Sequence, residues 1–570
     1  MTRSKELRNV GPEIDALRLG MDWHSSDLDR YQILIESTQG SSHPGSFALD
    51  QLVEAIEIGI RYGQGKPAKF TVTDICDGIA QGHEGMNYSL VSREIMAAMV
   101  EIHARANPID GLVLVSACDK AVPAHLMAAA RLNIPVIHVP GGVMSSGPGG
   151  LTLEQIGTYH VKQQRGEITT EEFAQLKANA CPSCGACQFM GTAGTMQVMA
   201  EALGLALPGS AVAPFSLKTI KNLARGAGKQ IISLIEKGIT SKEILTFEAF
   251  YNAIVIHAAI SGSTNALLHL PAIAREAGVE IKPQLFDEIN KKVPCLVNTR
   301  PTGKYATEYF WYAGGVPALM LKLKDFLYLD VMTCTGKTLR VNLESLEKGL
   351  TSNNGYLDKY GIRPEEIILP LEKPISEKGS IAILQGNLAQ EGAVVKYAAV
   401  APQMCVHIGP AKVFNNELKA RQAILQGKIS PGDIIVINYA GPKGSGMPEM
   451  FYTTEALAAS PQLIATTAII TDGRFSGATR GPAIGHISPE AAEGGTIAFV
   501  EDDDLIEIDI PNRKLNIVGI NNSYKTPQEI DEVIALRKSK GVKINLNGPK
   551  GVLGLYQRLA TSAMTGGYMK

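Results

Sequence analysis

The sequence predicts an α/β N-terminal domain with a doubly wound parallel sheet, followed by a β-rich, barrel-like C-terminal domain. The chain has 570 residues, more than one hydrophobic core normally serves, so at least two domains are expected. Its first part alternates Val- and Ile-rich runs with amphipathic segments, which is typical of β-α-β units. After about residue 370, short strand-like runs follow one another between Gly, Pro and Asp. We therefore expect domains at 1–370 and 371–570.

The individual elements follow from these runs. In the first domain we expect strands at 69–75, 111–117 and 134–142, and helices at 91–106 and 123–133. In the second domain we expect few helices and strands within 380–389, 432–442, 466–477, 494–504, 505–511 and 514–518. The chain after residue 526 looks helical.

Bulk composition excludes several classes of partner. Lys+Arg 54 against Asp+Glu 56 gives a net charge of −2, without a long basic run, so neither nucleic acid nor an anionic membrane is an expected partner. The charged N-terminus lacks the apolar core of a secretory signal, which indicates a cytoplasmic protein. Residues 252–274 lack Asp, Glu, Lys and Arg but contain many polar side chains, so we interpret them as protein interior rather than a membrane span.

Cysteine and aspartate stand together at two predicted strand ends, as Cys76-Asp77 and Cys118-Asp119-Lys120. A third cysteine, Cys187, closes the triplet that begins with Cys181 and Cys184. Ligands of open parallel sheets gather beyond the carboxyl ends of the strands, so these groups can share one crevice. Thiolates select iron–sulfur clusters or zinc, and carboxylates select magnesium. The pattern favours an iron–sulfur cluster beside a hard cation, while an electron-transfer protein and a zinc-stabilised binding module remain alternatives.

Two further positions become candidate site residues only because of these cysteines and aspartates. Ser476 lies between Phe475 and Gly477 just after an apolar strand, where a hydroxyl can be exposed, although most such serines only cap or turn. Glu449 ends the glycine-rich run 441–449, which by itself is typical of a surface loop.

Several segments occur in a recognisable order: CDGIAQGHEGMNYSLVSRE, SACDKAVPAHLMAA, CPSCGACQFMGTAGTMQVMAEALGLALPGSA, SGSTN, GNLAQEGAVVK, GPKGSGMPEM and TDGRFSGATRGPAIGHISPEAAEGG. Together they resemble the dihydroxy-acid dehydratase and sugar-acid dehydratase family over nearly the whole chain. The resemblance implies a hydro-lyase that removes water from a 2,3-dihydroxy acid to give a 2-keto-3-deoxy acid, using an iron–sulfur cluster and Mg²⁺. It also implies a homodimer or homotetramer.

The resemblance assigns roles to individual residues. It implies Mg²⁺ ligands at Asp77, Asp119, Glu449 and a carboxylated Lys120, which also counts as catalytic; cluster ligands at Cys118 and Cys187; and a catalytic base at Ser476. The first domain would then hold the cluster and most Mg²⁺ ligands, and the second the serine and the glutamate. This division suits the reaction, because a Lewis acid must take up the charge of the departing hydroxyl while a base removes a proton.

One departure from the family pattern shapes two further expectations. No cysteine precedes Cys76, whereas branched-chain dihydroxy-acid dehydratases have an early one. We therefore expect Cys76 to be the third cluster ligand and favour a four-iron over a two-iron cluster, with His43 as a weaker alternative ligand. Because this departure resembles xylonate-type enzymes, we expect a sugar-acid substrate, with a branched-chain dihydroxy acid as the alternative. Candidate partners for the sugar hydroxyls are His43, His83, Glu84 and Arg480.

Overall fold

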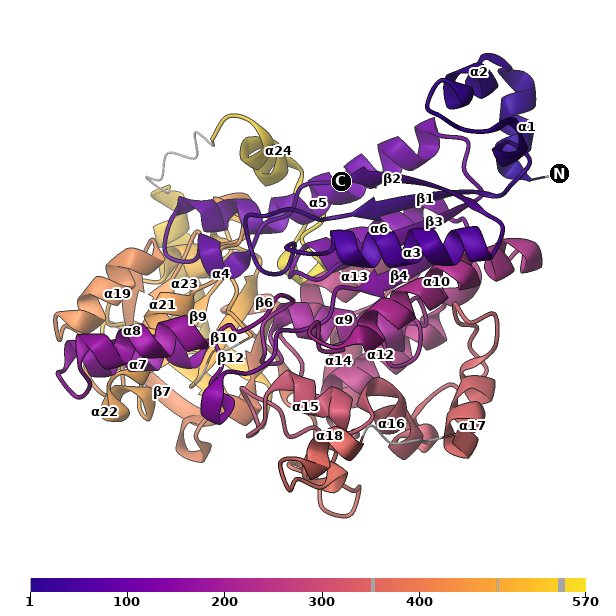
Figure 1. The fold of residues 1–570 in the computed structure, drawn as a ribbon. Helices are drawn as coiled ribbons and strands as arrows, with labels where there is room; N and C mark the ends of the chain where they lie inside the picture. Colours follow the sequence, from indigo (N-terminus) through magenta and orange to yellow (C-terminus); the bar gives the residue numbers. More distant parts are fainter. Residues whose placement is uncertain (1, 350–353, 478, 480, 542–548) are drawn as a thin grey trace.

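The computed structural model describes residues 2–349, 354–477, 479, 481–541 and 549–570, which form two domains in contact (Figure 1). The N-terminal domain contains a four-stranded sheet in the order β2-β1-β3-β4, in which every pair is parallel. Its strands are β1 (Gln32–Ser37), β2 (Lys66–Thr71), β3 (Gly111–Ser116) and β4 (Val136–Pro140). The expected α/β domain with a parallel sheet is confirmed.

Helices cover both faces of this sheet. The chain passes from β1 to β2 through α3 (Asp50–Tyr62), and in the opposite direction from β3 to β4 through α6 (Ala121–Leu132). Because such crossovers are right-handed, these two helices lie on opposite faces. The α3 helix packs against α10 (Lys218–Lys237), and α6 packs against α5 (Ser89–Ala106). A side chain at Gly59 would collide with the Arg225 carbonyl, so this glycine permits the close approach of α3 and α10.

The remaining helices of the N-terminal part extend the covering layers. They are α1 (Arg3–Val10), α2 (Glu13–Leu19), α4 (Asp77–Ala80), α7 (Gln155–Gln164), α8 (Thr170–Asn179), α9 (Thr192–Ala202), α11 (Ser241–Ile244), α12 (Phe247–Ala259), α13 (Ala266–Glu276), α14 (Pro283–Asn290), α15 (Thr307–Tyr312), α16 (Gly315–Lys322), α17 (Leu339–Gly349) and α18 (Asn354–Asp358). The segment 252–274 is buried in α12, α13 and the turn between them, as expected. Among the described residues, none of the helices has the length and apolar character that crossing a bilayer requires.

The C-terminal domain is a closed β-barrel. Its sheet runs β11-β7-β8-β9-β10-β6-β5-β12, and pairing of β11 with β12 closes the ring of eight strands, while β13 pairs outside it with β12. The strands are β5 (Ile381–Gly386), β6 (Ala389–Lys396), β7 (Val406–Phe414), β8 (Ile434–Ile437), β9 (Ala468–Thr471), β10 (Ala483–Ser488), β11 (Leu505–Asp509), β12 (Lys514–Ile520) and β13 (Ser523–Tyr524). The barrel-like prediction is confirmed.

Parts of the barrel differ from the sequence prediction. The run 494–504, expected to contain a strand, contains a 3-10 helix at Thr496–Phe499, because a short buried apolar run looks the same in either conformation. More helix is present than expected: α19 (Glu417–Leu425) joins β7 to β8, which lie parallel, and α20 (Pro442–Ser445), α21 (Phe451–Ala458) and α22 (Pro461–Ile464) precede β9. The chain ends with α23 (Pro527–Ser539) and α24 (Val552–Leu559), as expected.

A small apolar cluster joins the two domains. Leu90 of α5 and Leu268 of α13 pack with Met447 of the barrel domain and Tyr556 of α24. All four side chains have no exposed surface. The contact therefore fixes the start of α5 next to the loop that follows β8.

Candidate active site

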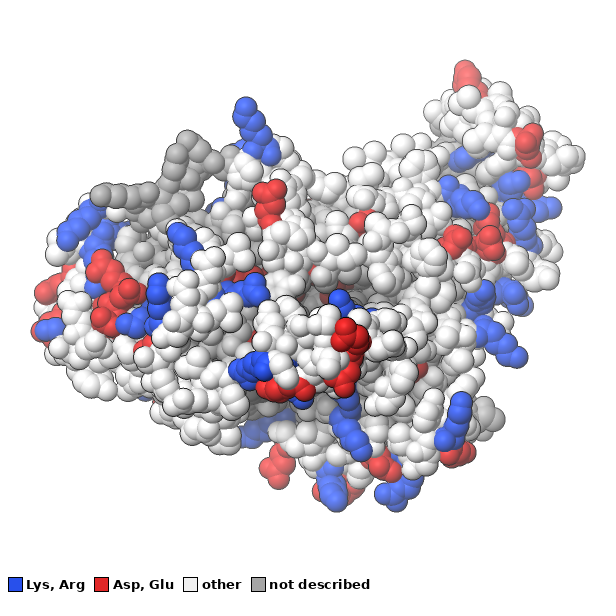
Figure 2. Space-filling view, turned by 60° about the vertical axis from the view of Figure 1, so that its left-hand side comes forward, with Lys and Arg blue, Asp and Glu red and all other residues white. Residues whose placement is uncertain are grey.

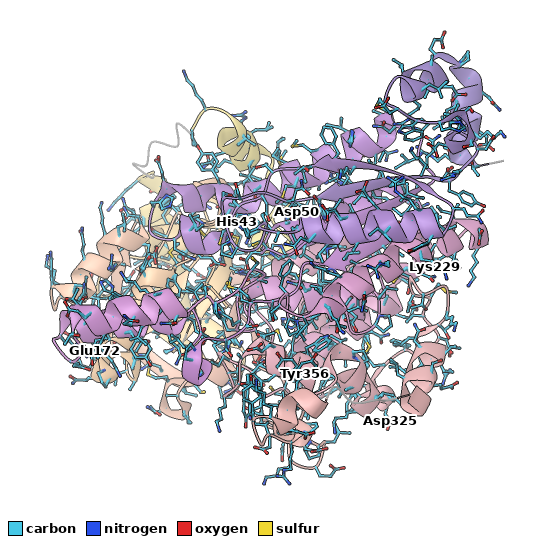
Figure 3. The ribbon with its side chains drawn as sticks, in the orientation of Figure 1. His43, Asp50, Glu172, Lys229, Asp325 and Tyr356 are labelled. Carbon is cyan, nitrogen blue, oxygen red and sulfur yellow. The ribbon has the colours of Figure 1, made fainter. Side chains whose placement is uncertain are left out.

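Three loops meet where the carboxyl ends of the parallel strands face the barrel domain (Figure 1). The strand order reverses its direction between β1 and β3, and such switch points leave a crevice for ligands. The loop after β1 carries His43, the loop after β2 carries Cys76 and Asp77, and the loop after β3 carries Cys118 to Lys120. Figure 3 places His43 on the side of the sheet that faces the barrel.

The three predicted cluster cysteines lie close together. The Cys76 and Cys118 thiols interact directly, and this contact lowers the pKa of Cys76 and raises that of Cys118. Burial raises the pKa of Cys187, and Cys76 and Asp119 raise it further. Three thiols from three separate loops therefore influence one another's ionisation, and thiol ligands of this kind are suited to an iron–sulfur cluster. Cys181, of the same triplet as Cys187, also lies near Cys76, which the sequence analysis did not anticipate.

His43 belongs to a second group beside Cys118. Its Nδ1 lies 3.7 Å from the Cys118 sulfur, and its Nε2 lies 2.9 Å from Ser46 Oγ and 3.8 Å from Asp74 Oδ2. One ligand atom each from His43, Asp74 and Cys118 lies within 4.8 Å of the others, a spacing that can hold a metal ion. Burial raises the pKa of Asp74 to about 7 and lowers that of His43. The backbone of the intervening Gly45 approaches so closely that any side chain there would overlap the Cys118 sulfur.

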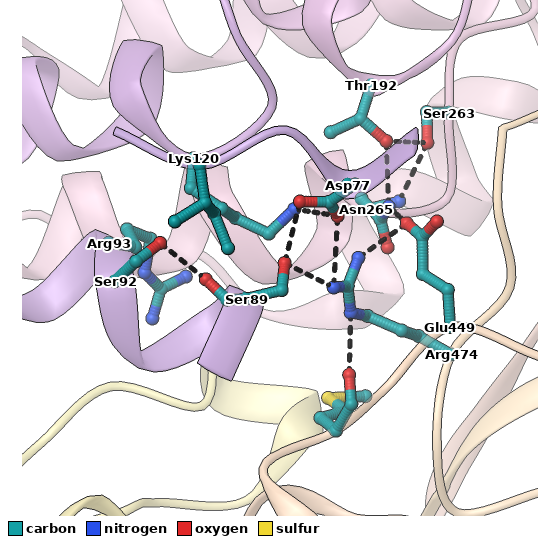
Figure 4. Close-up of polar contacts among 12 residues, drawn as sticks. Asp77, Ser89, Ser92, Arg93, Lys120, Thr192, Ser263, Asn265, Glu449 and Arg474 are labelled. Carbon is teal, nitrogen blue, oxygen red and sulfur yellow. Dashed lines mark hydrogen bonds and ion pairs between the residues drawn. The ribbon is translucent and has the colours of Figure 1, made fainter. Parts of the chain in front are cut away.

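A buried polar cluster lies next to the thiols and contains the predicted Mg²⁺ ligands Asp77, Lys120 and Glu449 (Figure 4), and the fourth, Asp119, lies near them. The Lys120 ammonium, which has no exposed surface, donates to Asp77 Oδ2 over 2.7 Å. Burial raises the pKa of Asp119 to about 7, and the nearby Asp77 and Glu449 carboxylates contribute to the shift. Burial would also raise the pKa of Asp77, but Lys120 and Arg474 outweigh that effect and lower it.

Arg474 is a central member of this cluster that the sequence analysis missed. Its guanidinium is fully buried, and it lies 2.5 Å from Glu449 Oε1 and 3.3 Å from Asp77 Oδ2. It also donates to the Met447 carbonyl over 2.8 Å and to Ser89 Oγ over 2.9 Å. Arg474 stands two residues before Ser476 in the quoted segment TDGRFSG, but sequence alone does not reveal its carboxylate partners.

Amide side chains orient Glu449 from the other domain. Asn265 donates to Glu449 Oε1 over 2.7 Å and to Thr192 Oγ1 over 2.7 Å, and Gln81 donates to Glu449 Oε2 over 2.9 Å. Asn265 ends the quoted segment SGSTN, which the sequence analysis used only for the resemblance. Thr192 begins α9, so the start of this helix reaches the cluster.

The donors and charges of the cluster suit a hard divalent cation. Three carboxyl groups, those of Asp77, Asp119 and Glu449, lie beside two cations, those of Lys120 and Arg474. Burial is the main cause of the raised pKa of Asp119 and the surplus of carboxylates adds to it, and Mg²⁺ would offset this surplus through the oxygen ligands that it prefers.

Ser476 lines an enclosed cavity next to the polar cluster. Val394, Phe475, Ala483 and Gly485 form its apolar wall, and Thr264, Lys396 and His486 supply polar groups. The cavity volume is about 20 Å³, room for about one water molecule. A Cβ at the neighbouring Gly477 would lie 2.8 Å from Gly191 Cα, so the serine loop touches the start of α9.

The residues expected to bind sugar hydroxyls are not gathered around this cavity. His83 is exposed and bonds within its own loop, accepting from the Gly85 amide, and Glu84 is also exposed. His43 lies beside Cys118 instead. Arg480 lies outside the described residues.

Comparison with known proteins identifies the family. Residues 30–342 match the family described as Dihydroxy-acid/6-phosphogluconate dehydratase N-terminal, and residues 366–567 match the corresponding C-terminal family. The chain belongs to this dehydratase family. It is therefore a hydro-lyase, as the sequence analysis predicted.

Related proteins correct the substrate prediction. A protein from Caldanaerobacter subterraneus subsp. tengcongensis is 46% identical, over 95% of this chain and 94% of the relative. One from Acetivibrio thermocellus is 44% identical over 97% of both chains, and one from Methanosarcina barkeri is 43% identical over 95% of both. All three are named dihydroxy-acid dehydratase. The prediction of a sugar-acid dehydratase of the xylonate type is wrong, and its alternative is favoured.

Proposed function

We propose that this chain is a dihydroxy-acid dehydratase that converts a branched, apolar 2,3-dihydroxy acid to its 2-keto acid. The observation that carries the proposal is the apolar wall of the Ser476 cavity, formed by Val394, Phe475 and Ala483. Methyl branches of a substrate gain free energy by contact with such a wall, whereas additional hydroxyl groups would lose their hydrogen bonds to water there. The names of the full-length relatives point to the same substrate class.

The cofactor residues are the second part of the proposal. Cys76, Cys118 and Cys187 would hold an iron–sulfur cluster, with four irons favoured over two, and Asp77, Asp119, Glu449 and a carboxylated Lys120 would hold Mg²⁺. The grouping of the three thiols and the surplus of carboxylates support these assignments. When bound, the two metal centres supply Lewis acidity to the hydroxyl that leaves C3. Carboxylation would exchange the Lys120 cation for oxygen ligands.

The protein's own groups perform the proton chemistry. Ser476 Oγ, as an alkoxide, takes the proton from C2, and the electron pair of that C–H bond forms the C2–C3 double bond as the C3–O bond breaks. Ser476 returns that proton to the departing hydroxide, which leaves as water. The resulting enol then moves its hydroxyl proton to C3 and becomes the 2-keto acid. The cavity walls limit the access of water to Ser476 during these steps.

The test is turnover by cluster-loaded enzyme under anaerobic conditions with Mg²⁺. We expect 2-keto acid, detected as its semicarbazone, from 2,3-dihydroxy-3-methylbutanoate and little from an aldonic acid of similar length. Iron and sulfide analysis should give about four of each per chain. Turnover of the aldonic acid alone would reject the proposed substrate, and an intact cluster in Cys76→Ser would reject the ligand set. Loss of iron in His43→Ala would indicate that His43 is a ligand of the iron–sulfur cluster.

The cellular location and the oligomeric state of the enzyme are also part of the proposal. We propose a cytoplasmic enzyme that assembles as a homodimer or homotetramer, and exposed apolar side chains around the edge strand β2 support the oligomer. Phe70 on β2, Tyr62 at the end of α3 and Ile102 on α5 are each more than half exposed. Sedimentation at several protein concentrations would reject the oligomer if it gave only the monomer mass.

A further inference from the structure

Lys396 is a cation without a carboxylate partner in the Ser476 cavity. It ends β6, and its ammonium donates to the Ser261 carbonyl over 2.7 Å. Among the described residues no Asp or Glu lies within ion-pair distance of it. Burial lowers the pKa of Lys396 to about 8, with a smaller opposing effect from the Cys295 thiol. Keeping a charge there costs free energy that a bound anion would offset.

The surroundings of Lys396 fit a ligand site better than a structural role. Ser261, which accepts its hydrogen bond, has a φ of 51°, and His486 across the cavity has a φ of 58°. Residues other than glycine rarely adopt this backbone conformation, and it is concentrated at functional sites. Both ring nitrogens of His486 are buried without a hydrogen-bond partner in the protein, so this wall too has unused polar capacity.

The local charge balance defines what Lys396 would bind. The chain carries a net charge of −2, and on the face in Figure 2 basic and acidic side chains are interspersed, so the overall field does not attract an acid strongly. Thr264 lies on the cavity wall, and the next residue, Asn265, donates to Glu449 of the buried polar cluster. The carboxylates of that cluster repel a substrate carboxylate. The charge of Lys396 counteracts that repulsion within the cavity.

We propose that Lys396 binds the C1 carboxylate of the substrate and thereby places C2 at Ser476. This inference rests on the proposed function, because it identifies the carboxylate subsite of the same cavity. A cation at C1 also stabilises the negative charge that spreads onto the carboxylate as the C2 proton leaves. Lys396 therefore contributes both to binding and to the chemical step.

The first test compares Lys396→Met with Lys396→Arg, using 2,3-dihydroxy-3-methylbutanoate and its primary amide. Loss of a charge-assisted contact should lower kcat/KM of Lys396→Met for the acid by about 100-fold. The amide should react equally slowly with wild type and Lys396→Met, and Lys396→Arg should recover part of the activity on the acid. Lys412→Met is the matched control, because Lys412 lies on β7 and pairs with Asp503. Equal losses for acid and amide would overturn the inference.

A binding measurement separates this inference from the proposed function. The compound 2-hydroxy-3-methylbutanoate keeps the carboxylate but lacks the C3 hydroxyl, so it cannot lose water. Calorimetry should show binding to wild type and Lys396→Arg, and binding about 100-fold weaker to Lys396→Met, with folding checked by circular dichroism and iron content. If wild type turns over the dihydroxy acid and Lys396→Met binds the analogue as tightly as wild type, then the Lys396 subsite is rejected and the proposed function stands. Lys396-dependent binding without turnover would reject only the dehydratase proposal.

Discussion

Replacing Arg474 by methionine tests whether the carboxylates of the buried polar cluster need a counter-ion, both in the absence and in the presence of Mg²⁺. The side chain has no exposed surface, and the change removes two ion pairs, to Glu449 and Asp77, and two hydrogen bonds, to Met447 and Ser89. Breaking a buried ion pair from one side costs about 3–5 kcal/mol. For a domain of about 200 residues that corresponds to a lowering of the unfolding midpoint by roughly 6–20 °C.

Magnesium should reduce this loss of stability, because a divalent cation compensates the charge of the carboxylates that Arg474→Met leaves unpaired. A ligand at about 100 times its Kd stabilises a protein by about 2.7 kcal/mol. In the variant Mg²⁺ also replaces a lost counter-ion, so the midpoint difference between Mg²⁺ and EDTA should be larger in Arg474→Met than in wild type. The assay is anaerobic thermal unfolding of cluster-loaded protein in both conditions.

The control is Arg340→Met, which removes an exposed arginine paired with Asp330 and should leave the midpoint unchanged. If Arg474→Met unfolds within about 2 °C of wild type in EDTA, the ion pairs do not stabilise the fold as argued. If the Mg²⁺ effect is equal in variant and wild type, then the cation does not bind among these carboxylates.

Three further changes test other parts of the site. Ser476→Ala should lower kcat by about 10²- to 10⁴-fold and leave the visible spectrum of the cluster unchanged; a smaller loss would mean that another group is the base. Gly45→Ala should lose iron because its Cβ overlaps the Cys118 sulfur, whereas a Cβ at Gly78 lies 3.6 Å from the Cys76 sulfur, so Gly78→Ala is the control and should keep its iron. Burial raises the pKa of Glu201 to about 8, so the protonated form is favoured in the folded state; its stabilisation is complete below pH 4.5 and lost as pH rises toward 8. Urea unfolding across this range should show a larger loss in wild type than in Glu201→Gln, and identical pH curves would contradict the assignment.

The sequence predicted the fold class well because hydrophobic patterns report directly on burial. The strands at 111–116 and 136–140 and the helices that flank them appeared as expected. β1 was missed even though all six of its residues are buried, because a short apolar run without alternation carries no period. Pairing around the barrel depends on contacts between strands far apart in the sequence, such as β6 with β10, which local patterns do not contain.

The site was harder to predict because its chemistry depends on which loops meet. Cys76 and Cys118 were expected to come together because both follow parallel strands, and they do. Arg474 could not be recognised as a counter-ion until the fold had placed Asp77 beside it. The sugar-acid prediction was drawn from the missing early cysteine, which concerns cluster ligation, whereas the cavity wall of Val394 and Phe475 is the feature that bears on the substrate.

The location of the site between two domains has an energetic consequence. Asp77 and Gln81 come from the first domain, and their partners Arg474 and Glu449 come from the barrel. Separating the domains would therefore leave charged and polar groups buried without partners or would require their hydration, and it would break the joint apolar core. The bonds from Arg93 of α5 to the Gly566 and Gly567 carbonyls near the C-terminus add to the same contact. Substrate should thus reach Ser476 through movement of the loops around the cavity, while the two domains stay together and keep Arg474 and the carboxylates in register.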